Sequence, residues 1–136
     1  MTLCDTGPLV AIIDRRDIHH TTCVAALPSI PTGGLVTTWP CLAEAMHLLW
    51  RAGGAAAQEM LWNYVAEGLI ELYEPAEGEW ERMRMLMRQY NDAPMDLADA
   101  SLVAAAERLG VGQIFTVDRH FHAYRIHGRD AFEVVP

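Results

Sequence analysis

The chain contains 136 residues and carries a formal net charge of −8 at pH 7, because 18 acidic side chains outnumber 10 basic ones. All ten basic residues are arginines, and the absence of lysine excludes Schiff-base catalysis and the lysine of a phosphate-binding P-loop. The negative charge also disfavours nonspecific nucleic-acid binding, which depends on cations that neutralise phosphates. We expect a single domain spanning residues 1–136, since a chain of this length buries roughly two thirds of its unfolded surface.

The N-terminal segment MTLCDTGPLVAIID lacks the positive charge of a secretory signal, and no apolar run reaches membrane-spanning length. We therefore expect a cytoplasmic protein without a membrane partner. Three cysteines, Cys4, Cys23 and Cys41, lie in apolar stretches without a CxxC pair. This pattern predicts reduced core thiols rather than disulfides or a zinc site.

Short, partly β-branched apolar runs alternate along the chain with longer segments of helical period that are rich in alanine and leucine. The expected strands cover residues 2–4, 35–37, 69–73, 113–117 and 132–135. The expected helices cover residues 8–14, 18–26, 40–51, 55–68, 77–91 and 96–109. This alternation predicts an α/β fold, a three-layer α/β/α sandwich around a central, mainly parallel sheet of four or five strands. Sites in such folds lie beyond the carboxyl ends of the strands.

Four acidic residues are candidates for such a site. Asp5 and Asp118 each follow an expected strand, so both belong at the carboxyl edge of the sheet. Glu44 lies early in the helix that follows the second strand, and a helix after a strand begins at that same edge. Asp99 lies in the first turn of a helix that follows another helix, so topology alone does not place it.

These acids also have structural interpretations. Asp5 can cap a helix whose first turn contains Pro8. Asp96, three residues before Asp99, fits a variant of the capping box. Asp118 can be a turn residue at a strand end.

Glu44 is harder to explain structurally, because it is the only charged side chain in the largely apolar segment 38–50. A buried acid there would need a partner. Like charges gathered at one edge of a sheet call for a cation, and oxygen ligands without convergent histidine or cysteine suit Mg²⁺ or Mn²⁺ rather than zinc.

The chain resembles the PIN-domain ribonucleases, particularly the VapC-type toxins of toxin–antitoxin pairs, over essentially its whole length. Four motifs carry the resemblance, each around one acid: LCDT with Asp5 and Thr6, CLAEAMHLL with Glu44, LADASLVAAAERLG with Asp99, and FTVDRHF with Thr116, Asp118 and Phe121. Their order and spacing match the family. The resemblance also implies that the helix beginning near Asp99 reaches the acidic cluster. Many relatives carry an acid where this chain has His120.

The resemblance implies hydrolysis of RNA phosphodiester bonds that depends on Mg²⁺ or Mn²⁺. Asp5, Glu44, Asp99 and Asp118 are then both the catalytic residues and the metal ligands, because such ions activate water and stabilise charge on the phosphate. Supporting roles fall to Thr6, Asp96 and Thr116, and possible RNA contacts to Arg15, Arg16, Arg119 and Arg125. Clustered acids also account for much of the negative charge, which weakens the objection to RNA binding. The implied partners are an RNA substrate, a small antitoxin protein and a second copy of the chain in a homodimer.

Two alternatives belong to other functional classes. A magnesium-dependent phosphatase of the haloacid-dehalogenase type needs a second aspartate two residues after the first, and that position is Gly7. A non-catalytic PIN-type module that only binds RNA would be expected to have lost acids, whereas all four are present.

Overall fold

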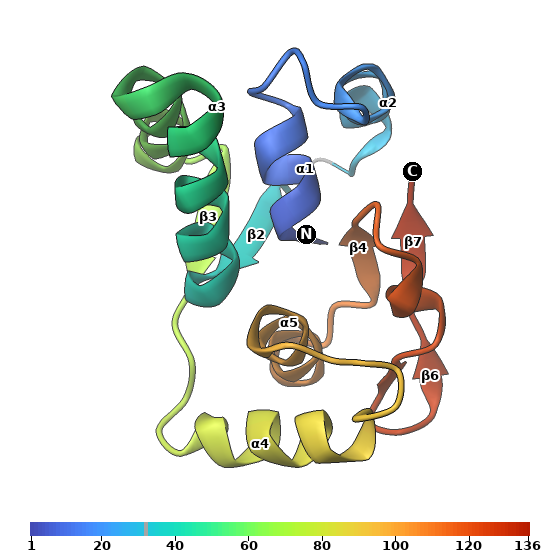
Figure 1. The fold of residues 1–136 in the computed structure, drawn as a ribbon. Coiled ribbons are helices and arrows are strands. Elements are labelled where there is room, and N and C mark those ends of the chain that lie inside the picture. Colours follow the sequence, from blue (N-terminus) through green and yellow to red (C-terminus); the bar gives the residue numbers. More distant parts are fainter. Residues whose placement is uncertain (32) are drawn as a thin grey trace.

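A parallel five-stranded sheet lies at the centre of the computed structural model, which describes residues 1–31 and 33–136. The strand order is β3-β2-β1-β4-β7 (Figure 1). The strands are β1 (Thr2–Cys4), β2 (Leu35–Thr38), β3 (Ile70–Tyr73), β4 (Gln113–Phe115) and β7 (Glu133–Val135). Every pairing in this sheet is parallel, so the predicted α/β sandwich is confirmed.

Helices cover both faces of the sheet. One face carries α1 (Thr6–Ala11), α2 (His20–Ala26) and α3 (Trp39–Ala66), and the other carries α4 (Glu79–Gln89) and α5 (Leu97–Leu109), as Figure 1 shows. From β1 the chain moves outward through β2 to β3, and then crosses back to β4 on the far side of β1. Because parallel crossovers are right-handed, these opposite directions of travel place the two sets of helices on opposite faces.

The two helices expected at 40–51 and 55–68 form one element, α3, with a break at Gly54. Gly54 has φ 66° and ψ −153°, a conformation that a side chain would strain. A Cβ at this position would meet no atom within 4 Å, so backbone freedom rather than space explains the glycine. The Gly53-Gly54 pair therefore redirects α3 after its first half.

Helix α5 is the most deeply buried helix among the described residues, because it packs between the sheet and α4. Alanine predominates along it, and the run from Ala98 to Ala106 is buried throughout. Small side chains let the helix approach its neighbours closely. Asp96 caps its start and Gly110, at φ 68°, ends it, so the first turn of α5 has a fixed position at the sheet edge.

Smaller elements complete the chain. A hairpin of β5 (Arg125–Ile126) and β6 (Asp130–Ala131) was not predicted, nor were the short 3₁₀ helices η1 (Leu27–Ser29) and η2 (Arg119–His122). The three cysteines are buried and free, as the sequence predicted. Over residues 1–31 and 33–136, no helix combines the length and the apolar character needed to cross a membrane.

Candidate metal centre

Strand β1 is the point at which the direction of strand order reverses, since its two neighbours are β2 and β4. Ligands of open α/β sheets bind at such a switch point, beyond the carboxyl ends of the strands. Asp5 directly follows β1, and Asp118 follows β4 after two intervening residues. Both aspartates therefore lie at the place where this fold forms a site.

Three carboxylates converge at this place. One oxygen from each of Asp5, Asp99 and Asp118 lies within 4.8 Å of the other two. They line a cleft of about 250 Å³ whose wall also includes Thr6, Gly7, Glu44, Leu48, Asp96 and Val117. The start of α5 thus reaches the cluster, which sequence topology alone had left open for Asp99.

Asp5 is both a helix cap and a member of the cluster. Its Oδ1 accepts a hydrogen bond from the backbone N–H of Thr6 at 2.7 Å, which caps α1. Its Oδ2 accepts from the hydroxyl of Thr116 at 2.8 Å. The weakly polar thiol of Cys41 also lies 3.9 Å from Oδ1. The structural and the functional interpretations of Asp5 are therefore compatible.

Asp99 is held from two sides. It forms the predicted capping box with Asp96: Asp99 N–H donates to Asp96 Oδ1 at 2.8 Å, and Asp96 N–H donates to Asp99 Oδ2 at 3.4 Å. The hydroxyl of Tyr124 lies 3.1 Å from the same Oδ2. Asp96 itself is exposed and lies at the margin of the cleft.

Asp118 is the most open of the three converging acids. Its Oδ1 accepts from the backbone N–H of His120 at 2.9 Å and caps η2. The Nδ1 of His120 lies 2.9 Å from the same oxygen. His120 is therefore a neighbour of Asp118.

Burial and the repulsion of neighbouring carboxylates make Asp5 and Asp99 harder to ionise than ordinary aspartates. Burial raises the pKa of Asp5 to about 6, although hydrogen bonds from Thr116 and Thr6 oppose the rise. Burial, reinforced by the charges of Asp96 and Asp5, also raises the pKa of Asp99 well above its ordinary value. A cation among the three would reverse this balance, since an opposite charge within a few ångströms favours the ionised form.

The structure places Glu44 differently from the three aspartates. Its side chain is exposed, whereas the apolar surroundings in the sequence suggested burial. Glu44 belongs to the exposed side of α3, and the apolar residues around it in sequence face the core or other parts of the surface. Its Oε2 accepts from the hydroxyl of Thr6 at 3.3 Å, and it lines the cleft. Glu44 therefore lies at the open side of the cluster and not within it.

The supporting threonines both contact acids. The hydroxyl of Thr6 lies 3.3 Å from Oε2 of Glu44 and 3.4 Å from the carbonyl oxygen of Cys41. Thr116 donates to Asp5 and accepts from the backbone N–H of Asp118 at 3.0 Å. Each hydroxyl thereby orients groups at the cluster.

The four candidate RNA-binding arginines have different surroundings. Arg119 lines a second hollow, of about 240 Å³, together with Asp118 and His122. Arg15 and Arg16 line another groove, against the middle of α3. The guanidinium of Arg125 donates to the carbonyl oxygens of His122 and Tyr124. Of the four, Arg119 adjoins the acidic cluster most directly, as the residue after Asp118.

Sequence reasoning missed Tyr124 and the contact between His120 and Asp118. Tyr124 follows the last motif by three residues, and nothing in its spacing indicates contact with Asp99, 25 positions earlier. The contact between His120 and Asp118 could have been predicted, because side chains two positions apart commonly meet in a capped turn.

The donor set fits a divalent cation. Carboxylate and hydroxyl oxygens predominate, and hard oxygen ligands are those that Mg²⁺ and Mn²⁺ prefer. No histidine lines the cleft in the part of the chain that the structure describes. Asp5, Asp99 and Asp118 are the residues that would hold the ion.

A parallel sheet with acids at its switch point is the arrangement of a PIN domain, and the PIN domain family model matches residues 2–126. The chain belongs to the PIN domain family, among its VapC-type members. Ribonuclease VapC26 of Mycobacterium tuberculosis is 30% identical over 135 residues, which cover 98% of this chain and 99% of that protein.

Solved structures share the fold. The crystal structure of Mycobacterium tuberculosis VapC20, described as a toxin that cleaves the sarcin–ricin loop, matches with a TM-score of 0.85 over 100% of both chains at 20% identity. A toxin–antitoxin complex from Klebsiella pneumoniae matches with a TM-score of 0.65 at 20% identity, over 100% of this chain and 97% of that one.

Proposed function

We propose that this chain is a Mg²⁺- or Mn²⁺-dependent endoribonuclease and the toxin component of a toxin–antitoxin pair. The observation that carries the proposal is the convergence of three carboxylates at the switch point of a PIN-type sheet. The 30% identity to a protein named as a ribonuclease supports RNA as the substrate. Free buried thiols support action in the reducing cytoplasm.

Each residue has a role in this proposal. A divalent ion held by Asp5, Asp99 and Asp118 would activate water and stabilise negative charge on the scissile phosphate. Thr116 fixes Asp5, while Glu44, positioned by Thr6, adds a carboxylate on the side open to substrate. Arg119 would neutralise a flanking phosphate.

The structure gives a reason to reject the phosphatase alternative. A Cβ added at Gly7 would lie 2.8 Å from Cγ2 of Val117, closer than atoms pack. An aspartate two residues after Asp5 therefore does not fit. The retained acids likewise argue against a module that only binds RNA.

Cleavage of RNA oligonucleotides by the purified chain tests the proposal. Addition of Mg²⁺ or Mn²⁺ should support cleavage, EDTA should stop it, and Asp99→Asn should be inactive under all conditions. Cleavage that persists in EDTA, after contaminating metal and nuclease have been excluded, would count against a metal-dependent mechanism.

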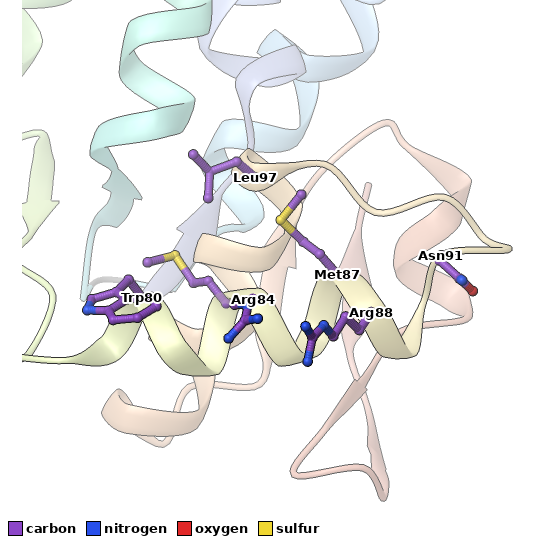
Figure 2. Close-up of a pocket in the computed structure, with 7 residues that line it drawn as sticks. Trp80, Arg84, Met87, Arg88, Asn91 and Leu97 are labelled. Atoms are coloured by element: carbon purple, nitrogen blue, oxygen red, sulfur yellow. The ribbon is translucent and has the colours of Figure 1, made fainter.

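We also propose a homodimer that forms through α4. Figure 2 shows Trp80, Arg84 and Arg88 along this helix, with Leu97 at the start of α5, around a groove of about 460 Å³. Trp80 is 60% exposed, which is unusual for a tryptophan. The first turn of α4 is acidic, with Glu81, and its last turn is basic, with Arg88. Two copies of α4 packed antiparallel about a twofold axis would therefore place opposite charges together.

An antitoxin is the other proposed partner. Trp50, Met60 and Trp62 are exposed along α3, while Met46 is partly buried against the core, so three of these four residues are available to an amphipathic segment. The adjacent acidic cluster would accept an arginine from the same partner, because guanidinium groups form charge-assisted bonds to carboxylates.

A further inference from the structure

Tyr124 is a buried tyrosine that lies outside the acidic cleft yet contacts one of the carboxylates within it. Its side chain is 0% exposed, and its hydroxyl lies 3.1 Å from Oδ2 of Asp99. The carbonyl oxygen of Pro94 lies 2.6 Å from the same hydroxyl, so the two acceptors share its single proton. The hydroxyl therefore connects α5 to the segment that leads into it.

Aromatic packing fixes the ring of Tyr124. Phe121 meets it edge-on, with ring centroids 5.0 Å apart, and Tyr90 meets it at 5.1 Å. Phe121 packs in turn against Phe132 at 5.5 Å. A ring held on several sides presents its hydroxyl at one place, so the contact with Asp99 does not depend on a flexible side chain.

The two oxygens of Asp99 have different surroundings. Oδ2 contacts the Tyr124 hydroxyl and the N–H of Asp96. Within residues 1–31 and 33–136, no hydrogen-bond donor contacts Oδ1 and every fully buried side-chain oxygen has a partner, so Oδ1 keeps some exposure, and Asp99 lines the cleft. Anchoring one oxygen to the protein directs the other toward a ligand.

We propose that Tyr124 is a positioning residue of the metal centre, whose hydroxyl holds Oδ2 of Asp99 and so aims Oδ1 at the divalent ion. Groups that hydrogen-bond to a ligating carboxylate orient it and raise metal affinity. Tyr124 does not line the cleft, so it acts through Asp99 and not on the RNA. The inference rests on the proposed metal-dependent function.

Mn²⁺ binding to the full chain, measured by calorimetry without RNA, tests this role. Tyr124→Phe removes only the hydroxyl and should weaken Mn²⁺ binding about 10- to 100-fold, the usual effect of losing an orienting partner. Tyr90→Phe is the matched control, because Tyr90 belongs to the same aromatic group but its hydroxyl accepts from the backbone N–H of Arg125. Tyr90→Phe should bind Mn²⁺ as the unchanged chain does.

Cleavage assays add a second readout. Tyr124→Phe should need more Mn²⁺ for half-maximal cleavage, while kcat at saturating Mn²⁺ should approach that of the unchanged chain. Equal Mn²⁺ affinity in the unchanged chain and Tyr124→Phe, with only the melting temperature lowered, would overturn the positioning role. Absence of Mn²⁺ binding to the unchanged chain would overturn the proposed metal centre itself, and this inference with it.

A measurement on the unchanged chain decides the question if Tyr124→Phe does not fold. Addition of Mg²⁺ should shift the NMR signals of the Tyr124 ring but not those of Tyr90, because only the Tyr124 hydroxyl contacts a proposed ligand. Tyr124 signals that stay in place while Mg²⁺ binds would overturn the proposal.

Discussion

The hydroxyl of Thr116 connects two acids of the cluster, because it donates to Oδ2 of Asp5 at 2.8 Å and accepts from the backbone N–H of Asp118 at 3.0 Å. Asp5 follows β1 and Asp118 follows β4, so this one side chain links the carboxylate of Asp5 to the backbone of Asp118 across two neighbouring strands. The same hydrogen bond opposes the rise in the pKa of Asp5 that burial causes.

Thr116→Val should therefore weaken metal binding, because it removes the hydroxyl while keeping a side chain of nearly the same size and branching. Without the hydroxyl, the pKa of Asp5 should rise further, and Mn²⁺ affinity should fall about 10- to 100-fold. Thr37→Val is the matched control, since Thr37 is equally buried in the sheet but donates to the carbonyl oxygen of Cys4 at 2.8 Å. Calorimetric titration of both variants checks the prediction, and equal losses in both would contradict it.

The metal-free chain should be more stable at mildly acidic pH than at alkaline pH. The pKa of Asp5 is about 6 in the folded chain against an ordinary value of 3.8, so the folded state binds the proton more tightly. Stability then falls as pH rises through this window, by about 3 kcal/mol for this group, because one pKa unit corresponds to about 1.4 kcal/mol. The raised pKa of Asp99 acts in the same direction.

Urea unfolding in EDTA at about pH 5 and about pH 8 measures the part of this difference that lies above pH 5, about 1.4 kcal/mol for Asp5, because the folded-state pKa lies about one unit above pH 5. Asp5→Asn cannot ionise, so it should lose that part of the pH dependence and should match or exceed the unchanged chain in stability at pH 8. Mg²⁺ should restore stability to the unchanged chain at pH 8. An Asp5→Asn chain that is much less stable than the unchanged chain at this pH would indicate that the carboxylate serves chiefly to cap α1.

The sequence was sufficient to place Asp5 and Asp118, because each follows a strand and the carboxyl ends of parallel strands share an edge. Asp96 was also predicted correctly as a cap, since the capping box is a local pattern. The position of Asp99 needed the family resemblance, because no local rule says where a helix that follows another helix begins in space.

Features that depend on tertiary packing could not be predicted from the sequence. The exposure of Glu44 depends on which side of α3 faces the sheet, and the mixture of apolar and small residues there left that side ambiguous. The contact between Tyr124 and Asp99 joins residues 25 positions apart, with most of α5, β4 and η2 between them, so no local pattern reveals it. The short hairpin of β5 and β6 has only two residues in each strand, too few for alternation to be visible.

Glu44 and Asp99 should differ in their effect on catalysis. Asp99 is 7% exposed and belongs to the converging group, whereas Glu44 is exposed and lies at its open side. Asp99→Asn should reduce kcat by more than about 100-fold, and Glu44→Gln by about 10- to 100-fold, the range for a residue beside a metal ligand. Single-turnover cleavage at several Mn²⁺ concentrations compares them. If Glu44→Gln proved as damaging as Asp99→Asn, Glu44 would have to be a direct ligand.

The proposed dimer should depend on charge pairing along α4. Arg88→Glu should place like charges against Glu81 of a second copy and shift the chain toward the monomer, as measured by sedimentation. Adding Glu81→Arg to that variant should restore the dimer, because the pair is then reversed. Arg129→Glu, which changes an exposed charge on the turn before β6, is the control. It should leave the molecular mass measured by sedimentation at that of the dimer. A chain that is monomeric without any substitution would rule the dimer out.

A small protein encoded beside this chain should bind it and block cleavage by placing an arginine among Asp5, Glu44, Asp99 and Asp118. Burial raises the pKa values of Asp5 and Asp99, and a nearby cation favours their ionised form, so a guanidinium and a divalent ion should compete for these carboxylates. Inhibition by the neighbouring protein should therefore weaken as Mg²⁺ is raised. A form of that protein with its C-terminal arginines changed to alanine should still bind the exposed face of α3, but its residual inhibition should not respond to Mg²⁺. Cleavage titrations with both forms separate the two contributions. If the neighbouring protein neither binds nor inhibits, the antitoxin assignment fails and the chain is better described as a nuclease that acts alone.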